Sequence, residues 1–296
     1  MDGIINLIKP QNMTSHDVVN IVRKKLMTKR VGHTGTLDPM ATGVLPICVG
    51  QATRVIEYLV ADKKKYKCQL TLGIKTDTQD IWGEVLEKKD VHITEEEIKN
   101  TVKTFIGDIT QIPPMYSAVR IDGRRLYEYA REGVEIQRES RKVTIYHIDI
   151  ISIQGEKITL EVECSKGTYI RTLCNDIGEA LGCYGTMSAL ERIASGIFTI
   201  DEGITLEDLG TLSPEEYLIP ADQPLTEMGQ AEIKDKKTFL KASNGGSLSD
   251  AEVLWKDKKK WNRIYYKHLF IAIGEYNGEN SKIRMKKVFN YTELPI

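Results

Sequence analysis

The sequence has little cysteine and no long apolar run. Its 296 residues include five cysteines, an odd and widely spaced set without a C-x-x-C pair, so reduced thiols are expected. The N-terminal MDGIINLIKP lacks the basic start of a signal peptide, and no stretch approaches the ~20 apolar residues of a membrane span. We therefore expect neither export nor a membrane anchor, and a cytoplasmic location.

Several catalytic motifs are also absent. The chain has no G-x-x-x-x-G-K-[ST], G-x-G-x-x-G, H-E-x-x-H or G-x-S-x-G, so nucleotide-binding, zinc-protease and hydrolase functions lack their usual support. Asp77 and Asp80 lie in TDTQD, but their spacing is not that of an EF-hand and no Glu follows at the twelfth position. The sequence therefore predicts no metal site.

The sequence also lacks an excess of charge of one sign, since it contains 41 Lys and Arg residues and 42 Asp and Glu residues. That balance alone argues against a polyanionic partner. The charges are unevenly distributed, however: residues 144–231 carry 15 acidic and 4 basic side chains, whereas residues 232–296 carry 8 acidic and 14 basic ones. A basic binding surface is therefore compatible with the neutral total.

Apolar periodicity predicts a mixture of helices and strands. Ser15 is the expected N-cap of a helix with Val18, Val19, Val22 and Leu26 on one face. Residues 66–72 and 158–164 alternate as half-buried strands do, and residues 170–181 have helical spacing that ends near Gly182. This order favours an α+β or mixed α/β fold over a βαβ repeat.

Two further segments differ from the rest in composition. Residues 113–142 alternate basic and acidic side chains around three tyrosines, which indicates a surface insertion. Residues 232–296 contain 9 of the 21 aromatic residues, between turn signals such as Asn277-Gly278, and predict a small β-rich second domain. The first domain would then span residues 1–231.

The loop GHTGTLDPMATGVL (32–45) holds a single carboxylate, Asp38, among glycines and hydroxyl side chains. Pro39 disfavours the helical region for Asp38, and the glycines permit close approach of the backbone. A catalytic acid is one interpretation. The residue types alone favour the other, a turn-forming aspartate whose carboxylate bonds the backbone.

This loop resembles the signature of the TruB family of tRNA pseudouridine synthases. The similarity extends in order over most of the chain: KPQNMTSHDVV (9–19), GQATRVIEYL (50–59), KKYKCQLTLGIKTDTQD (64–80), PPMYSAVRIDGRRLYEYAREG (113–133), KGTYIRTL (166–173) and SALERIASGIF (188–198). Residues 273–289 resemble the family's C-terminal PUA-type domain more loosely. One departure is Gln11-Asn12, where the family more often has a glycine, and it touches no catalytic position.

The resemblance implies a pseudouridine synthase fold with a central mixed sheet. It also implies isomerisation of the uridine at position 55 in the T loop of tRNA, with no cofactor or metal, by a protein expected to be monomeric. Asp38 matches the catalytic aspartate, as nucleophile or base, and Arg171 its ionic partner. Tyr66 matches the tyrosine that stacks on the flipped base, Tyr169 and Leu190 match base contacts, and His33 matches the residue that fills the gap in the RNA.

Other binding residues are less defined by the resemblance. Residues 113–142 resemble the mobile thumb that closes on the T loop, and a basic tail cluster would meet the acceptor side of the tRNA: Trp255, Lys256, Lys258, Lys259, Lys260, Trp261 and Arg263. For Lys24, Lys25, Lys29, Arg30 and Lys63, Lys64, Lys65, phosphate contacts and solvated surface charge are equally compatible. Alternatives of the same scaffold are a non-catalytic tRNA-binding or tRNA-folding protein and an RNA-guided synthase.

Overall fold

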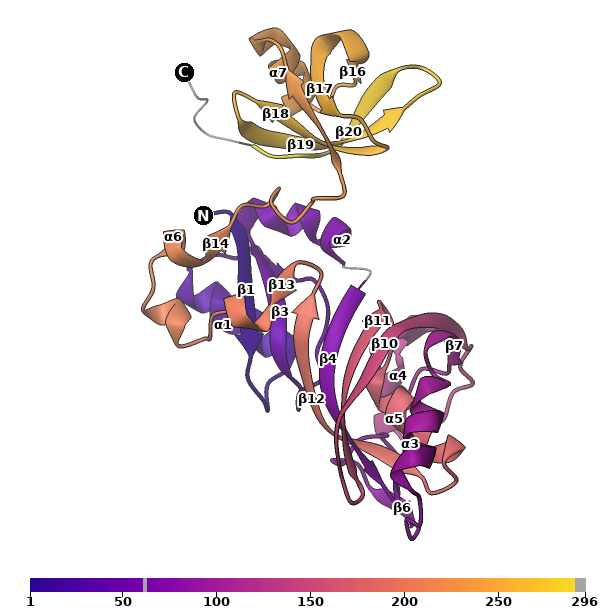
Figure 1. The fold of residues 1–296 in the computed structure, drawn as a ribbon. Helices are drawn as coiled ribbons and strands as arrows, with labels where there is room; N and C mark the ends of the chain where they lie inside the picture. Colours follow the sequence, from indigo (N-terminus) through magenta and orange to yellow (C-terminus); the bar gives the residue numbers. More distant parts are fainter. Residues whose placement is uncertain (61–62, 291–296) are drawn as a thin grey trace.

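The computed structural model describes residues 1–60 and 63–290. Its larger part is a ten-stranded sheet in the order β14-β1-β3-β12-β4-β11-β10-β7, with β13 paired to β12 and β2 to β3 (Figure 1). The strands are β1 (Gly3–Lys9), β2 (Val31–His33), β3 (Thr42–Val49), β4 (Lys63–Leu72), β7 (Gly107–Gln111), β10 (Arg141–Gln154), β11 (Lys157–Ser165), β12 (Gly185–Ser195), β13 (Phe198–Thr199) and β14 (Leu218–Ile219).

The sheet has two halves that meet between β3 and β12. This contact is short and parallel, with Glu191 opposite Thr42 and Arg192 opposite Gly43, whereas the other pairings described in the sheet are antiparallel. The sheet is therefore mixed, which confirms the fold class expected from the sequence. The halves splay apart beyond this contact (Figure 1).

The first helix, α1 (Ser15–Lys25), corrects one sequence expectation. Its N-cap is Thr14 rather than Ser15: the Thr14 hydroxyl accepts from the Asp17 amide at 3.0 Å, and the Asp17 carboxylate accepts from the Thr14 amide at 2.9 Å. This reciprocal box needs an acid three residues after the cap, and Asp17 satisfies that only for Thr14. Because α1 ends at Lys25, Lys29 and Arg30 lie beyond it.

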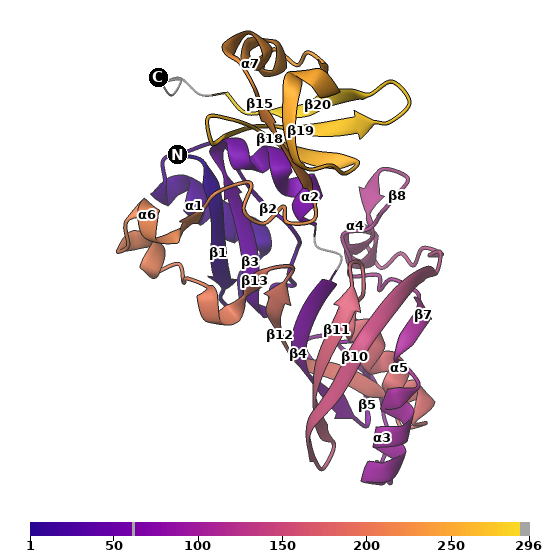
Figure 2. The same ribbon diagram turned by 45° about the horizontal axis from the view of Figure 1, so that its top comes forward.

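The other expected elements are confirmed. β4 buries Tyr66, Cys68, Leu70 and Leu72 on one face, and β11 buries Ile158, Leu160, Val162 and Cys164. The expected helix at 170–181 is α5 (Ile170–Ala180), which packs with α3 (Glu95–Lys103) against the half of the sheet formed by β12, β4, β11, β10 and β7 (Figure 2). Burial of these alternating apolar faces supplies the main core.

Short elements connect the large ones. Two small hairpins pair β5 (Ile74–Thr76) with β6 (Val85–Lys88) and β8 (Arg120–Ile121) with β9 (Arg124–Arg125). The remaining short helices are α2 (Ile56–Leu59), α4 (Leu126–Arg131), α6 (Pro214–Tyr217) and the 3-10 turns η1 (Gly50–Val55), η2 (Ile200–Glu202), η3 (Asp208–Gly210) and η4 (Asp250–Glu252). In the described part of the chain, no helix has the length and apolar character needed to cross a membrane.

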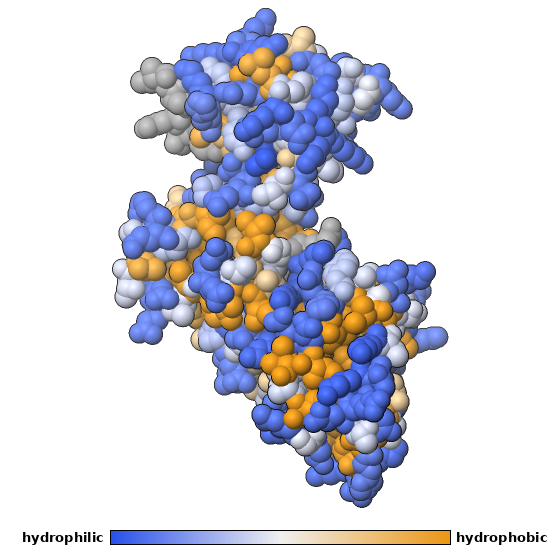
Figure 3. Space-filling view, viewed as in Figure 1, coloured by the Kyte–Doolittle hydropathy of each residue, from blue (hydrophilic) through white to orange (hydrophobic). Residues whose placement is uncertain are grey.

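The C-terminal part forms a second sheet of six strands, as its composition predicts. The strand order is β16-β20-β19-β18-β15-β17, with α7 (Lys236–Ser243) beside it. The strands are β15 (Gly229–Ile233), β16 (Leu248–Ser249), β17 (Val253–Asp257), β18 (Trp261–Tyr266), β19 (Leu269–Asn277) and β20 (Lys282–Val288). The sheet stands at the end of the molecule where α2 lies, and its visible surface is largely hydrophilic (Figures 2 and 3).

The two sheets share an apolar cluster. Phe270, Ile273 and Phe289 of the second sheet region pack with residues that include Val44 and Val55 of the first. Beside this cluster, the Gln51 side-chain amide donates to the Asn290 carbonyl and accepts from the Asn290 amide, both at 2.6 Å. Burial of apolar groups and this reciprocal pair hold the second sheet against the first.

Candidate active site

Asp38 lies in the loop between β2 and β3, at the end of the first half of the sheet. Its carboxylate meets Arg171, from the first turn of α5 in the other half: Arg171 Nε lies 3.0 Å from Oδ2, and Nη2 donates to Oδ1 at 3.3 Å. The Asp38 side chain is 37% exposed and that of Arg171 only 4%. The Asp38 carboxylate is therefore open to solvent, while the guanidinium that pairs with it is buried.

The Arg171 side chain is buried and has further partners besides Asp38. Its Nη1 donates to the Thr78 carbonyl at 3.2 Å, and its Nη2 donates to the Tyr116 carbonyl at 2.9 Å. Nη1 also lies 3.4 Å from Asp80 Oδ2, so the guanidinium bridges two carboxylates. These contacts over-determine its orientation toward Asp38.

Asp80 is a site residue that sequence analysis considered only as a calcium ligand. Burial raises the pKa of its carboxyl, while hydrogen bonding from the Thr78 hydroxyl at 2.7 Å and the charge of Arg171 act in the opposite direction. The carboxylate of Asp77 turns elsewhere and accepts from the Glu84 amide at 2.7 Å. The two acids therefore do not converge on one ion.

Three buried polar side chains, Lys9, Ser15 and Arg192, hold the loop around Asp38, and the sequence analysis assigned no role to Lys9 or Arg192. Arg192 of β12 donates to the carbonyls of Val44, Thr36 and Gly35 at 2.7, 3.3 and 3.1 Å. Its side chain is 1% exposed, so these bonds lie in a dry environment where they are strong.

Lys9 and Ser15 anchor the other side of the loop. Lys9 Nζ donates to the carbonyls of Pro39, Met13 and Pro10 at 3.0, 2.7 and 2.8 Å, and burial lowers its pKa to about 8. The Ser15 hydroxyl accepts from the Leu37 amide at 2.9 Å. Ser15, mistaken for a helix cap in the sequence, thus fixes the residue that precedes Asp38.

Gly43 shows why this loop needs glycine at the junction of the sheet halves. Its φ is +102°, and a Cβ at this position would lie 2.3 Å from the Arg192 carbonyl oxygen. Both the backbone angle and the close approach exclude larger residues. Gly43 therefore allows the parallel contact that places Arg192 under the loop.

Tyr66 lies on β4 directly opposite Arg192 of β12 and is 7% exposed. Burial raises the pKa of its hydroxyl, and the nearby Arg192 guanidinium opposes that shift. Leu190, 9% exposed, is on the same strand as Arg192 and opposite Cys68. The structure therefore brings Tyr66 and Leu190 together on adjacent strands beside the loop that carries Asp38.

His33 and Tyr169 complete the expected set. His33 ends β2 and is half-buried rather than exposed; burial lowers its pKa, and Nδ1 has no hydrogen-bond partner in the described residues. Tyr169 is the N-cap residue of α5, and Gln111 bonds its backbone twice, accepting from the amide at 3.0 Å and donating to the carbonyl at 3.2 Å. Gln111 thereby fixes the start of the helix that carries Arg171.

The insertion at 113–142 contacts the site through the Tyr116 carbonyl on Arg171. Many of its other interactions are internal. The guanidinium of Arg124 lies 4.5 Å from the Tyr129 ring, and those of Arg125 and Arg131 lie 5.7 and 5.3 Å from the Tyr127 ring. Such stacking holds the guanidinium groups at the surface of the insertion.

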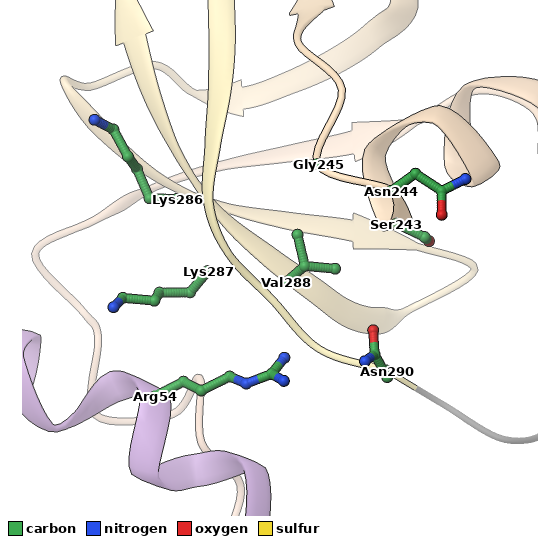
Figure 4. Close-up of a pocket in the computed structure, with 8 residues that line it drawn as sticks. All are labelled: Arg54, Ser243, Asn244, Gly245, Lys286, Lys287, Val288 and Asn290. Carbon is green, nitrogen blue, oxygen red and sulfur yellow. The ribbon is translucent and has the colours of Figure 1, made fainter.

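A second basic region lies between the two sheets. A cleft there is lined by Arg54 near the end of η1, by Lys286 and Lys287 of β20, and by Ser243 and Asn244 at the end of α7 (Figure 4). Lys286 Nζ lies 2.8 Å from Glu275 Oε2, and Lys287 Nζ lies 2.6 Å from Glu57 Oε1. In the tail cluster expected to contact RNA, Trp261 instead packs on Tyr58 at 5.4 Å between centroids. Sequence reasoning missed the cleft because its residues are far apart in the chain.

Comparison with known proteins covers nearly the whole chain. Residues 23–170 match the N-terminal domain of TruB family pseudouridylate synthase, and residues 171–227 match the tRNA pseudouridylate synthase B C-terminal domain. Proteins named tRNA pseudouridine synthase B are 52% identical in Alkaliphilus oremlandii (98% of this chain, 91% of the relative) and 46% identical in Clostridium tetani (96% and 98%).

Solved structures agree with these sequence relatives. The fold resembles a chain of a Cbf5-Nop10-Gar1 complex, with a TM-score of 0.76 and 28% identity over 97% of this chain and 84% of the other. It also resembles a chain of an H/ACA RNP bound to a substrate RNA containing 2′-deoxyuridine, with a TM-score of 0.74 and 27% identity over 98% and 85%.

Proposed function

We propose that this chain, which belongs to the TruB family of pseudouridylate synthases, isomerises the uridine at position 55 in the T loop of tRNA to pseudouridine. One observation carries the proposal: a solvent-accessible Asp38 carboxylate paired to the buried guanidinium of Arg171. In the reaction the N1–C1′ bond breaks, the base turns, C5 bonds to C1′, and the C5 proton is lost while N1 is protonated. Asp38 acts at the ribose.

The remaining site residues receive binding roles. A uridine in a folded loop must leave its stack to reach Asp38, at a cost of a few kcal/mol. Tyr66 covers the face of the extruded base, and aromatic stacking is worth about 1–3 kcal/mol. Tyr169 and Leu190 border the base, and His33 occupies the gap left in the RNA.

The rest of the chain serves tRNA binding in this proposal. Residues 1–231 form the catalytic domain, in which residues 113–142 close on the T loop, and residues 232–296 form a PUA-like RNA-binding domain. The basic cleft of Arg54, Lys286 and Lys287 offers one surface for a phosphate backbone. The enzyme acts as a monomer in the cytoplasm, where its substrate is found.

Replacement of Asp38 by Asn tests the proposal. The variant keeps the side-chain shape but loses the ionised group, so we expect no pseudouridine from an unmodified tRNA transcript, with tRNA affinity within about tenfold, or 1.4 kcal/mol, of wild type. Asp201→Asn at an exposed position is the matched control. Turnover by Asp38→Asn contradicts the role of Asp38, and no turnover by the wild type favours a tRNA-binding protein.

A second substrate separates the stand-alone enzyme from a guided one. An isolated T-arm hairpin contains the target loop but no guide RNA or protein partner. We expect pseudouridine formation in this hairpin at a rate within about tenfold of that in tRNA. A hairpin that binds but is not converted contradicts a stand-alone enzyme.

A further inference from the structure

Three consecutive lysines begin β4, and the strand separates them onto two faces. Lys63 and Lys65 point to the face away from the site, where Lys63 Nζ lies 3.1 Å from Glu163 Oε1 and Lys65 Nζ lies 2.5 Å from Glu161 Oε1. Successive side chains on a strand alternate between faces. Lys64 must therefore lie on the opposite face, the one that carries Tyr66.

Lys64 differs from its neighbours in having no side-chain partner among the residues that the structure describes. It is partly buried, and within residues 1–60 and 63–290 its ammonium forms no ion pair or hydrogen bond. A Cβ built on Gly35 would lie 3.4 Å from Lys64 Nζ and 3.7 Å from Arg192 Nη1. The ammonium therefore lies beside the loop that carries Asp38.

Within residues 1–60 and 63–290, the cations that act on Lys64 are Arg192 and Lys166. Burial and the Arg192 guanidinium together lower the pKa of Lys64 to about 8. Arg192 donates to three carbonyls, none of which neutralises its charge. The acids of the site, Asp38 and Asp80, are both held by Arg171. A partly buried ammonium that meets no anion in the described part of the chain is costly, so this position suits an anionic ligand.

We propose that Lys64 binds a backbone phosphate next to the nucleotide whose base stacks on Tyr66, and thereby positions its ribose over Asp38. The inference rests on the proposed function, because an RNA substrate supplies the phosphate. Lys64 and Tyr66 are two residues apart on one strand face, about 6.6 Å, a separation that a single nucleotide spans. A lysine ammonium is a suitable point charge for phosphate. The missing side chain of Gly35 leaves room beside the ammonium.

The salt dependence of tRNA binding tests this role directly. In Lys64→Met we expect the slope of log affinity against log salt concentration to fall in magnitude by about 1, and the affinity at 0.1 M salt to fall about five- to tenfold. Lys65→Met is the matched control, since it removes a neighbouring charge from the paired face, and its slope should equal that of wild type. Equal slopes in Lys64→Met and Lys65→Met overturn the proposal.

A substrate change locates the phosphate without relying on a variant's folding. In T-arm hairpins, one phosphate at a time around the target uridine is replaced by an uncharged methylphosphonate. One such linkage should weaken binding to wild type about five- to tenfold and have no further effect on Lys64→Met. Lys64→Arg, which keeps the charge, should restore the sensitivity. If no flanking linkage affects wild-type binding, or if each linkage affects wild type and Lys64→Met equally, the proposal is wrong.

The wild-type reaction separates this inference from the proposed function. A wild type that converts the unmodified hairpin but shows no Lys64-dependent slope or linkage effect leaves the function intact and rejects only the phosphate contact. A wild type that makes no pseudouridine rejects the function on which the contact rests.

Discussion

The loop at residues 32–45 and the insertion at residues 113–142 both reach Arg171, but they are held in different ways. The loop is bound by Lys9, Ser15 and Arg192, side chains that are at most 2% exposed and come from three other segments. The insertion has cation–π contacts of its own and exposed pairs such as Arg124–Glu132, and the side chain of Leu126 is buried within it. The loop thus holds the Asp38 carboxylate in place, whereas in the proposed function the insertion adjusts to the RNA.

The largest effect should come from the residue that both segments share. Arg171→Lys keeps a charge but cannot contact Asp38 side-on while also donating to the Thr78 and Tyr116 carbonyls. We expect the single-turnover rate on tRNA to fall about 10²- to 10³-fold, in the range of a misplaced catalytic group. Arg131→Lys, in the insertion and exposed, is the control and should react at nearly the wild-type rate. Similar rates in Arg171→Lys and Arg131→Lys would show that the Arg171 contacts to Asp38, Thr78 and Tyr116 are not needed for the reaction.

Arg192→Met should damage the loop by removing its central support. Three carbonyls lose their donor in a buried site, and we expect a loss of about 2–4 kcal/mol in the free energy of unfolding, measured by urea denaturation. The turnover rate should fall together with stability because Asp38 is no longer held. Unchanged stability would mean that other contacts suffice to fix the loop.

Lys9 adds a pH dependence. Because its pKa is about 8 in the folded protein and 10.5 as a free side chain, the unfolded chain binds more protons between these values, and the Lys9 contribution to stability rises with pH there. Activity should change in the opposite direction, since a neutral amine has two N–H groups for three carbonyls.

We therefore expect kcat to fall several-fold above about pH 8 and this alkaline fall to weaken in Lys9→Met. Lys64→Met should be measured in parallel, because the pKa of Lys64 is also about 8. The surface Lys25→Met serves as control. An identical alkaline fall in Lys9→Met and wild type would exclude Lys9 as its origin.

The smallest effect should come from the insertion. In Arg124→Ala an exposed ion pair and one stacked cation disappear, so stability should change by less than about 0.5 kcal/mol. tRNA affinity should weaken about two- to fivefold if the guanidinium meets a phosphate. A decrease in melting temperature as large as that of Arg192→Met would show that the Arg124 contacts in the insertion stabilise the protein as much as the Arg192 contacts to the loop.

Sequence patterns predicted the helices and strands whose formation depends on the spacing of apolar residues close together in the chain. The alternation that places Tyr66 on a buried strand face and the helix that begins before Arg171 follow from period alone. The roles of Lys9 and Arg192 were not predicted, because Lys9 reaches the Pro39 carbonyl 30 residues away and Arg192 reaches the Thr36 carbonyl 156 residues away. Asp80 was missed for a related reason, since its partner Arg171 is 91 residues away. The residue roles that rest on family resemblance stay predictions for the experiments above.

The apolar cluster shared by the two sheets fixes the distance between the Asp38 loop and the C-terminal sheet. Gln51 and Asn290 close the junction, so the separation between the Asp38 carboxylate and the C-terminal sheet is set by the fold and not by a linker. If an RNA binds both regions, as the proposed function expects, the distance from its target uridine to the part that contacts the C-terminal sheet must match this fixed separation. The length of the arm between the two contacts then contributes to affinity, so a tRNA whose arm is one base pair longer should bind more weakly even with an unchanged loop.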